Sequence, residues 1–441
     1  MDYFSESLNE PILDSGLDIF EKPVKASNFS SETEVIIQPT CPPSDSPHAS
    51  FKFILGGKDD RMYSIPSSIK IFGRLKVTLQ NGTDLTDEEI SVVCNFPETI
   101  FENIKVTLNG TPISDHGRGY GFKSYIAKKL SMPFITKSSS LLSHYWVEDG
   151  DKDGIRVDGT RFSDSFKSRK EIIKKSADVY FIFPPMVDLF NTERYIPSYT
   201  EIIIELERAP VTLPLLSDLA GLNAKIQIMD INMAVRRFTP HQSLILDHEK
   251  RMKRGDRMIL PFTRTSVRYR TLHPGVLSTV VPGCFTGQLP YSMIVGFLTN
   301  EQLSEVTHNP FIFNTQNLRK FNVVKNGVSI PQDPVNVGEL TGGGALLGYT
   351  HFIENIGSNI FTHDSGITPD DYFNRSFFIA YDFTPDKTLG ANNYEQENGT
   401  IDLCLQFKKK TTNTPLTLIV LGCFENTVQF NMDDTILDYT L

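Results

Sequence analysis

A strand-like segment that ends in an Asn-Gly turn occurs twice in this chain of 441 residues. The first copy is FENIKVTLNGTPI, residues 101–113, and the second is KFNVVKNGVSI, residues 320–330. Before each turn, apolar side chains alternate with polar ones, which is typical of a strand with one buried face. Asn-Gly suits turns whose backbone needs a positive φ. The two copies therefore predict that the chain contains an internal repeat of one β-rich unit.

Further segment pairs occur in the same order in both halves. FIFPP, which ends at Pro185, aligns with YDFTP, which ends at Pro385, and Phe238 aligns with Phe430. In the strand after residue 200, a match by letter would shift residues by 200 and place apolar positions opposite polar ones. A slip of one residue turns the buried face of a strand outward, so the alignment must be a shift of 199. That shift pairs Ile202, Ile204 and Leu206 with Ile401, Leu403 and Leu405.

Two copies of an all-β module, each with roughly eight strands, fit this pattern and the length of the chain. We therefore predict an all-β fold of two tandem eight-stranded jelly-roll barrels joined by a short helix, a double jelly roll. The expected divisions are an acidic, extended or flexible arm over residues 1–45, a first jelly roll over 46–238, a connecting helix over 239–255 and a second jelly roll over 256–441. Asn-Gly is common after strands, so a single matched pair could arise by chance.

Local patterns add three predictions. The connecting helix has Thr239 as its N-cap and Pro240 at its first position, and four basic residues in its last turns suit the helix dipole. The segment 120–130 has helical spacing, with Phe122, Tyr125, Ile126 and Leu130 on one face. In the strand 223–238 the apolar positions change parity near Met229-Asp230, which predicts a β-bulge. A polar loop is expected over roughly 148–170.

Composition restricts the binding partners and the cellular compartment that we expect for this chain. A net charge of −10 argues against a body that wraps nucleic acid through bulk positive potential. Five scattered cysteines without a CxxC pair indicate a reducing compartment rather than a disulfide framework. The first residues lack the pattern of a signal peptide, so secretion is not expected. No apolar run approaches the ~18 residues that a membrane span needs.

The candidate chemical motifs are weak, and we predict no catalytic, cofactor-binding or metal-binding residues. GRGYGF, 117–122, and TGGGALLG, 341–348, lack phosphate-loop spacing and are expected to be loops. His241, His248 and Glu249 do not have the spacing of a zinc protease site. The loop 362–373 holds His363, Asp364, Asp370 and Asp371, where a cation is conceivable but an inter-strand loop is expected. Basic spots occur at 174–180, 236–238, 250–255 and 408–410. They could meet nucleic acid or acidic neighbours, but solubility and dipole compensation explain most of them.

Several segments resemble the major capsid protein of Polinton/Maverick virus-like transposons and adintoviruses, which is related to virophage and adenovirus-type double jelly-roll capsid proteins. The segments that carry the resemblance are LDIFEKP (17–23), GRLKVTLQNGTDL (73–85), FENIKVTLNGTPIS (101–114), VDLFNTERYIPSYTEIIIELERA (187–209), KIQIMDINMAVRRFTPHQSLILDHEKRM (225–252), GQLPYSMIVGFLTNEQLSEVTHNPFIF (287–313) and FFIAYDFTPD (377–386). The stretches 148–170 and 333–350 depart from that family, and loops are expected there.

The resemblance implies a structural protein without catalytic residues or cofactors. It implies a homotrimer with a pseudo-hexameric outline, a hexon-type capsomer, that tiles an icosahedral shell around a DNA genome. The implied partners are neighbouring capsomers and penton or minor capsid proteins, with at most weak, indirect contact with packaged double-stranded DNA. The implied location is the virion, with synthesis in the host cytoplasm or nucleus. The acidic arm could clip onto a neighbour, so that deletion of residues 1–45 would spare trimers and impair shells.

Another class of protein also fits an all-β chain. A β-sandwich that binds glycans or a receptor, such as a minor capsid or fibre component, would show a concave aromatic site. An enzyme would need a metal in the loop 362–373.

Overall fold

The computed structural model of the protein describes most of the chain. The described residues are 29–42, 49–56, 61–86, 89–115, 117–150, 155–157, 161–197, 199–218, 224–338, 345–357, 365–387, 389, 396–411, 415–431 and 435–439.

The first half of the chain forms two antiparallel sheets that face each other. One sheet has the order β1-β13-β4-β10, with β3 paired to β13, and the other has the order β2-β11-β6-β7. The strands are β1 (Phe29–Ile37), β2 (Ser50–Leu55), β3 (Tyr63–Ser64), β4 (Lys70–Leu79), β6 (Phe101–Leu108), β7 (Thr111–Ser114), β10 (Val179–Phe183), β11 (Ile202–Arg208) and β13 (Ala224–Pro240). Alternate side chains of these strands form one core, as the burial pattern of β11 illustrates.

The second half repeats this arrangement. Its sheets have the orders β14-β21-β16-β19, with β22 paired to β21, and β15-β20-β17-β18. The strands are β14 (Met258–Leu272), β15 (Ser278–Gln288), β16 (Ser292–Thr299), β17 (Leu318–Lys325), β18 (Val328–Asn336), β19 (Phe378–Asp382), β20 (Asn398–Phe407), β21 (Leu416–Phe430) and β22 (Thr435–Leu437).

The two units share one strand order. If the eight main strands of each unit are numbered along the chain, the sheets read 1-8-3-6 and 2-7-4-5 in both halves. Eight strands in two facing sheets form a jelly roll, so the predicted double jelly roll is confirmed. Short strands outside this framework form two small sheets: β5 (Ile90–Val92) with β12 (Leu215–Ser217), and β8 (Arg156–Val157) with β9 (Arg161–Phe162).

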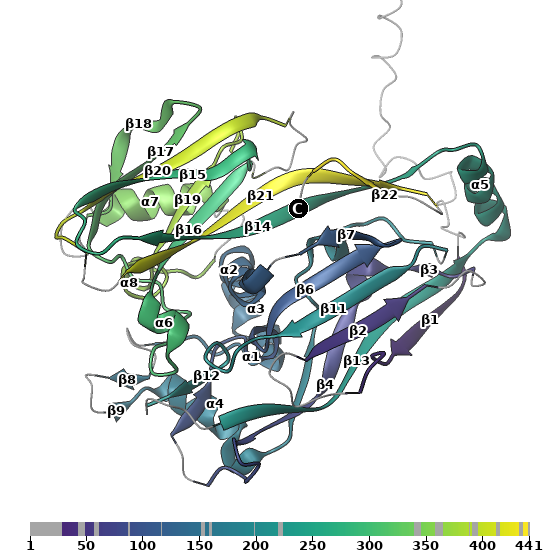
Figure 1. Ribbon diagram of the computed structural model, residues 1–441, viewed down its shortest axis with the longest axis horizontal. Coiled ribbons are helices and arrows are strands. Elements are labelled where there is room, and N and C mark those ends of the chain that lie inside the picture. The colour runs from purple at the N-terminus through teal and green to yellow at the C-terminus, as the bar shows by residue number, and fades with distance from the viewer. Residues whose placement is uncertain are drawn as a thin grey trace, which may run out of the picture.

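Helices fill the connections and lie between and around the sheets (Figure 1). The α-helices are α1 (Phe96–Thr99), α2 (Tyr120–Ser131), α3 (Phe134–Lys137), α4 (Asp164–Ile172), α5 (Gln242–Lys253), α6 (Asn300–Ser304), α7 (Ala345–Asn355) and α8 (Pro369–Asn374), and the 3-10 helices are η1 (Pro66–Ser68), η2 (Gly117–Gly119), η3 (Ser140–His144), η4 (Lys174–Ser176) and η5 (Asp188–Asn191). The predicted helix at 120–130 is α2, and its four predicted core residues are all buried.

Some local predictions were wrong. The connecting helix begins at Gln242 with His241 as its N-cap residue, because Thr239 and Pro240 continue strand β13, where they pair with β1. The loop expected over 148–170 contains α4, whose buried Phe166 and Arg169 anchor an otherwise polar helix. In the stretch 333–350, where loops were expected, β18 runs to Asn336 and α7 begins at Ala345. The loop predicted at 117–122 is η2 and the first turn of α2.

The two Asn-Gly turns occupy the same position in the two barrels. Asn109 and Asn326 have φ of 47° and 51°, and the following glycines have φ of 80° and 81°. The backbone N–H of Asn109 donates to the Glu201 carbonyl at 3.0 Å, and its side-chain oxygen accepts from the Glu201 N–H at 2.9 Å. Asn326 makes the same two bonds with Thr400, at 3.0 and 2.9 Å. Glu201 therefore corresponds to Thr400, which confirms the shift of 199.

The alignment at the end of the last strand needs a correction of one residue. Phe72 lies opposite Ile182 on one side and Asn232 on the other, while Ser292 lies opposite Asp382 and Cys423. This relates residue 232 to residue 423, a shift of 191, so Phe430 corresponds to Thr239 and not to Phe238. The predicted β-bulge in β13 is present, because the register shifts between Ile228 and Asp230. Opposite the bulge, a Cβ on Gly73 would lie 2.2 Å from the Asp230 carbonyl oxygen, so only glycine fits there.

The acidic segment is not wholly an arm. Residues 1–28 and 43–48 lie outside the described ranges, but Phe29–Ile37 forms strand β1 and pairs with β13 along its length. The boundary predicted at 45/46 is therefore misplaced, since β1 is an edge strand of the first barrel. The segment escaped notice because its side chains are mostly polar and exposed, and the backbone ladder holds it in place.

A buried ion pair of the first half of the chain is hydrogen-bonded to the second half. Asp188 of η5 accepts from Lys123 Nζ of α2 at 2.6 Å, and it also accepts from the Thr265 backbone N–H and hydroxyl of β14 at 2.8 and 3.1 Å. The Lys123 and Asp188 side chains are 4% and 6% exposed. Burial lowers the pKa of Lys123, while the adjacent Asp188 carboxylate opposes that shift.

The long strands β14 and β21 also bridge the barrels. Figure 1 shows them running past β7 from the second barrel towards α5. Their residues Leu260, Phe262, Val428 and Phe430 belong to the core of the first barrel, while Leu272 of β14 and Leu418 of β21 belong to the core of the second. The two jelly rolls therefore share buried apolar surface as well as a buried charge.

Replacing Asn109 or Asn326 with alanine should destabilise the protein by about 1–3 kcal/mol each, because each variant loses a hydrogen bond to the paired strand and places a Cβ-bearing residue without a local partner at positive φ. Urea unfolding measures the loss. Asn81→Ala is the control, since the Asn81 side chain accepts only from Thr83 in its own exposed turn. A loss at one of the two equivalent turns alone would contradict their shared role.

Replacing Asp188 with alanine should lower the free energy of unfolding by about 3–5 kcal/mol, because the Lys123 ammonium would stay buried without its counter-ion. The variant Asp188→Leu/Lys123→Met should recover much of that loss. Asp247→Ala, which removes an exposed pair with Arg251, should cost less than about 1 kcal/mol. Equal losses for Asp188→Ala and Asp247→Ala would refute a special role for the buried pair.

Candidate functional site

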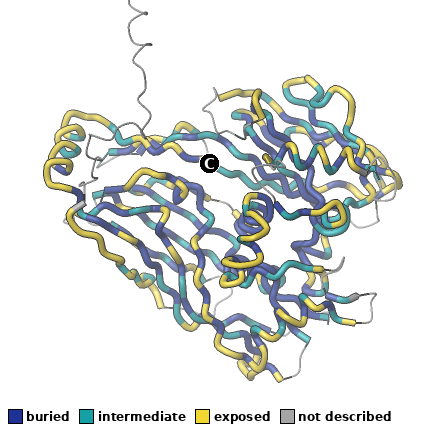
Figure 2. The backbone as a smooth tube through the Cα atoms, turned by 180° about the vertical axis from the view of Figure 1, so that it is seen from behind, coloured by how far each residue is buried: buried dark blue, intermediate teal, exposed yellow. Residues whose placement is uncertain are grey.

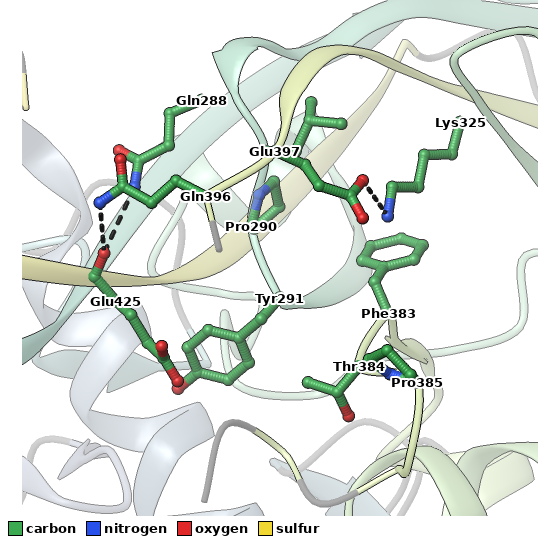
Figure 3. A pocket seen from close by; sticks show the side chains of 11 residues that line it. Gln288, Pro290, Tyr291, Lys325, Phe383, Thr384, Pro385, Gln396, Glu397 and Glu425 are labelled. Carbon is green, nitrogen blue, oxygen red and sulfur yellow. Dashed lines mark hydrogen bonds and ion pairs between the residues drawn. The ribbon is translucent and has the colours of Figure 1, made fainter. Parts of the chain in front are cut away.

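The Asn-Gly turn of the second barrel borders an open pocket of about 260 Å³ (Figure 3). Lys325, the residue before the turn, pairs with Glu397 at 2.6 Å, and its ammonium lies 5.5 Å from the centre of the Phe383 ring. On the other side of the pocket, Gln396 donates to the Glu425 carbonyl at 3.1 Å. Burial raises the pKa of the Tyr291 hydroxyl, which stays protonated at neutral pH. The lining is polar and aromatic.

The corresponding corner of the first barrel is covered by the end of the chain. The Asn109 side-chain amide donates to the Asn431 carbonyl at 3.0 Å, and the Tyr439 hydroxyl donates to the Ile113 carbonyl at 2.7 Å. Leu108, which corresponds to Lys325, is fully buried there. In the first barrel, the leucine at this position is therefore buried at a corner that the segment after β21 covers.

Two adjoining hollows of about 580 and 310 Å³ lie between α5 and the first barrel. Tyr63, Arg194, Tyr195 and His248 line both of them. Tyr63 and His248 are joined by a hydrogen bond of 2.8 Å between the hydroxyl and Nδ1. We call these two hollows together the α5 groove. Figure 2 shows that α5 is a largely exposed helix.

A third surface gathers large apolar side chains that face solvent. Ile135 of α3 is 77% exposed and Tyr180 of β10 is 67% exposed, and Phe134, Leu142 and Ile182 are exposed as well. The two parts are neighbours, because η3 packs on β10 and the Tyr145 hydroxyl donates to the Tyr180 carbonyl at 2.6 Å. We call these five residues the α3–β10 surface. Exposed apolar patches of this kind mark interaction sites more often than isolated apolar residues do.

The candidate metal motifs are not brought together. His241 contacts Ser243, and His248 contacts Tyr63. Asp370 and Asp371 lie on α8, where Asp371 accepts from Thr368 at the N-terminus and pairs with Arg375. His363 and Asp364 of the same predicted loop lie outside the described residues. Among the residues that the structure describes, no group of three or more His, Cys, Asp or Glu side chains could hold a metal ion.

All four basic spots have structural partners. Lys174 pairs with Glu171 at 3.0 Å, Arg237 donates to the Met62 carbonyl at 3.2 Å, and Lys408 donates to the Gly338 carbonyl at 3.0 Å. In the fourth, on α5, Arg251 pairs with Asp247 at 3.1 Å and also lines the α5 groove. Within the described ranges, the helices are all too short or too polar to cross a bilayer.

The cysteines form no disulfide bonds within the described part of the chain. All five cysteines are free thiols, and burial raises the pKa of Cys284 to about 11. A thiol with that pKa stays protonated near neutral pH and is a poor nucleophile.

Sequence reasoning found neither the α5 groove nor the α3–β10 surface. Both combine residues from segments far apart in the chain, and their separate segments carry no motif. For the pocket beside Lys325, the sequence contained one indication: lysine stands in the second repeat where the first has Leu108.

Comparison with solved structures identifies proteins that share this architecture. The fold is that of double jelly-roll capsid proteins of viruses. No protein-family model matches the chain, and no curated protein is similar to it in sequence. Solved structures carry the likeness.

The chain is similar to the structure of the Sputnik virophage solved by cryo-EM, with a TM-score of 0.62 and 12% identity, covering 96% of this chain and 92% of that chain. It is also similar to VP54 of PBCV-1, with a TM-score of 0.57 and 11% identity over 96% of this chain and 100% of that one. For the mavirus major capsid protein the TM-score is 0.53 and the identity 12%, over 97% and 93% of the two chains. At such identities the likeness concerns the fold.

Proposed function

We propose that this chain is a major capsid protein, of the virophage-related kind found in Polinton/Maverick and adintovirus-like elements. The observation that carries the proposal is the pair of jelly rolls with one strand order, fused through a shared core in a single chain. The likeness to viral capsid proteins over nearly the whole chain supports the same role. The role is structural, and it needs neither cofactor nor catalytic residue.

The proposed assembly unit is a homotrimer. Two barrels per chain give six barrels per trimer, so a closed threefold oligomer can occupy a hexagonal position in an icosahedral shell. Such hexon-type capsomers would contact one another and penton or minor capsid proteins, with at most weak, indirect contact with packaged double-stranded DNA. The protein would reside in the virion after synthesis in the host cytoplasm or nucleus.

The α3–β10 surface is the proposed contact between copies. It offers two exposed aromatic and three exposed aliphatic side chains on the flank of the first barrel. Burying that area against another copy would remove apolar surface from water at roughly 25 cal/mol per Å². The net charge of −10 would keep free capsomers soluble before assembly.

We also propose a revised division of the chain. The first domain would run from residue 29 to residue 240, so that it includes β1, and the second from residue 258 onward, with α5 between them. The deletion of residues 1–45 considered above would remove a sheet strand from the first barrel. Deletion of residues 1–28 is the variant that leaves the described strands intact.

The purified full chain should form trimers of about 149 kDa from three chains of 49.7 kDa each. Multi-angle light scattering measures the mass, and negative-stain microscopy should show six-sided particles. Ile135→Glu/Ile182→Glu should shift the protein to monomers, because two charges cannot be buried in an apolar contact. Val328→Glu is the matched control, since Val328 is exposed on β18 of the second barrel.

Monomers of the unaltered chain that bind glycans on an array would favour the alternative class, a glycan- or receptor-binding β-sandwich. Trimers that persist in Ile135→Glu/Ile182→Glu would move the contact to another surface without affecting the capsid role.

A further inference from the structure

The α5 groove has the features of a peptide-binding site. Tyr195 packs edge-on against Phe238 at 4.8 Å between ring centres, and Tyr63 packs on the ring of His248 at 5.8 Å. Leu244 of α5 is 36% exposed at the rim. At the rim of the hollow Tyr195 is 43% exposed, while Tyr63 and Phe238 are buried beneath it.

The other wall of the groove holds three arginines, of which Arg251 also pairs with Asp247 at 3.1 Å. Arg194, Arg251 and Arg257 line the larger hollow, with Asp256 as the acidic lining residue. Arg194 is held in place by a hydrogen bond of 2.6 Å to the Ile259 carbonyl. An occupant should therefore combine apolar side chains with negative charge.

One segment of this chain has that chemistry and directly precedes β1, the strand whose first residue lies beside the groove. Phe29, the first described residue, pairs with Pro240, which lines the smaller hollow. The preceding residues 1–28 hold six acidic and two basic side chains, with the apolar cluster Leu17-Asp18-Ile19-Phe20. Phe20 is nine residues from Phe29, and nine extended residues reach at most ~30 Å.

We propose that residues 17–20 of each chain dock into the α5 groove of the same chain. The apolar side chains of Leu17, Ile19 and Phe20 would fill the hollow beside Tyr195 and Leu244. Asp18 and Glu21 would face the three arginines. The short tether favours the chain's own groove, since it holds the segment at an effective concentration on the order of millimolar. The inference does not depend on the proposed capsid role.

Disulfide trapping in the full-length protein tests this docking. In a Cys41→Ser background, Phe20→Cys/Leu244→Cys should form a cross-link within one chain under mild oxidation. Non-reducing electrophoresis and mass spectrometry of the linked peptides identify it. Phe20→Cys/Leu246→Cys is the matched control. Leu246 is 46% exposed on the same helix, does not line the groove, and should trap several-fold less.

A band that links two chains would overturn the intramolecular docking and assign the groove to the segment of a second copy. Equal trapping at Leu244 and Leu246, or none at either, would overturn the docking altogether.

Hydrogen exchange of the full-length protein gives an independent readout that does not rely on cysteine variants. The amides of residues 17–20 should exchange at least ~10-fold more slowly than in an unstructured peptide. Leu244→Glu should abolish that protection, while Leu246→Glu should leave it in place. Unprotected amides in the unaltered protein would refute the proposal.

Discussion

The carboxylate of Asp188 ties together three elements that the rest of the structure depends on. It accepts hydrogen bonds from α2 of the first barrel and from β14 of the second, and its side chain is buried. A buried ion pair adds little to stability compared with a well-packed apolar contact, but it tolerates few alternative arrangements because either partner alone would be costly. Its contribution is therefore to fix how one barrel sits on the other, while β14 and β21 supply the apolar contact.

The framework of the fold could be read from the sequence because its signals are local and periodic. Alternation defined the strands, the Asn-Gly turns marked the same corner in both barrels, and face parity selected the shift that pairs Glu201 with Thr400. Elements held by tertiary contacts were missed. β1 is a polar edge strand stabilised by its backbone ladder, and α4 is a polar helix fixed by the buried pair of Arg169 and Asp149. The start of α5 was misjudged because Thr239 and Pro240 are good helix-start residues that pairing with β1 keeps in the strand.

The candidate surfaces could not be predicted for a different reason. The α5 groove joins Tyr63, Tyr195, Leu244 and Arg257, which come from four separate segments. Each residue is ordinary in its own segment, and a hollow exists only after the first barrel, α5 and the start of β14 have packed. The proposed function of this protein is to contact other proteins, and such composite surfaces would make those contacts. Motif spacing in a sequence detects catalytic and metal-binding sites instead.

The differences between the two barrels follow from what covers them. Both carry the same corner, with the same pair of hydrogen bonds, but among the described residues Asn431 and Tyr439 contact only the first of them. Leu108 is buried at that first corner. At the second corner, Lys325 takes its place and pairs with Glu397 at the edge of a pocket. A repeat that begins as two equal units can therefore become asymmetric through its tails, because a covering segment permits an apolar residue and an open corner favours a charged one. The same logic applies to the rim of the α5 groove, where a docked segment would remove Tyr195 and Leu244, 43% and 36% exposed, from water.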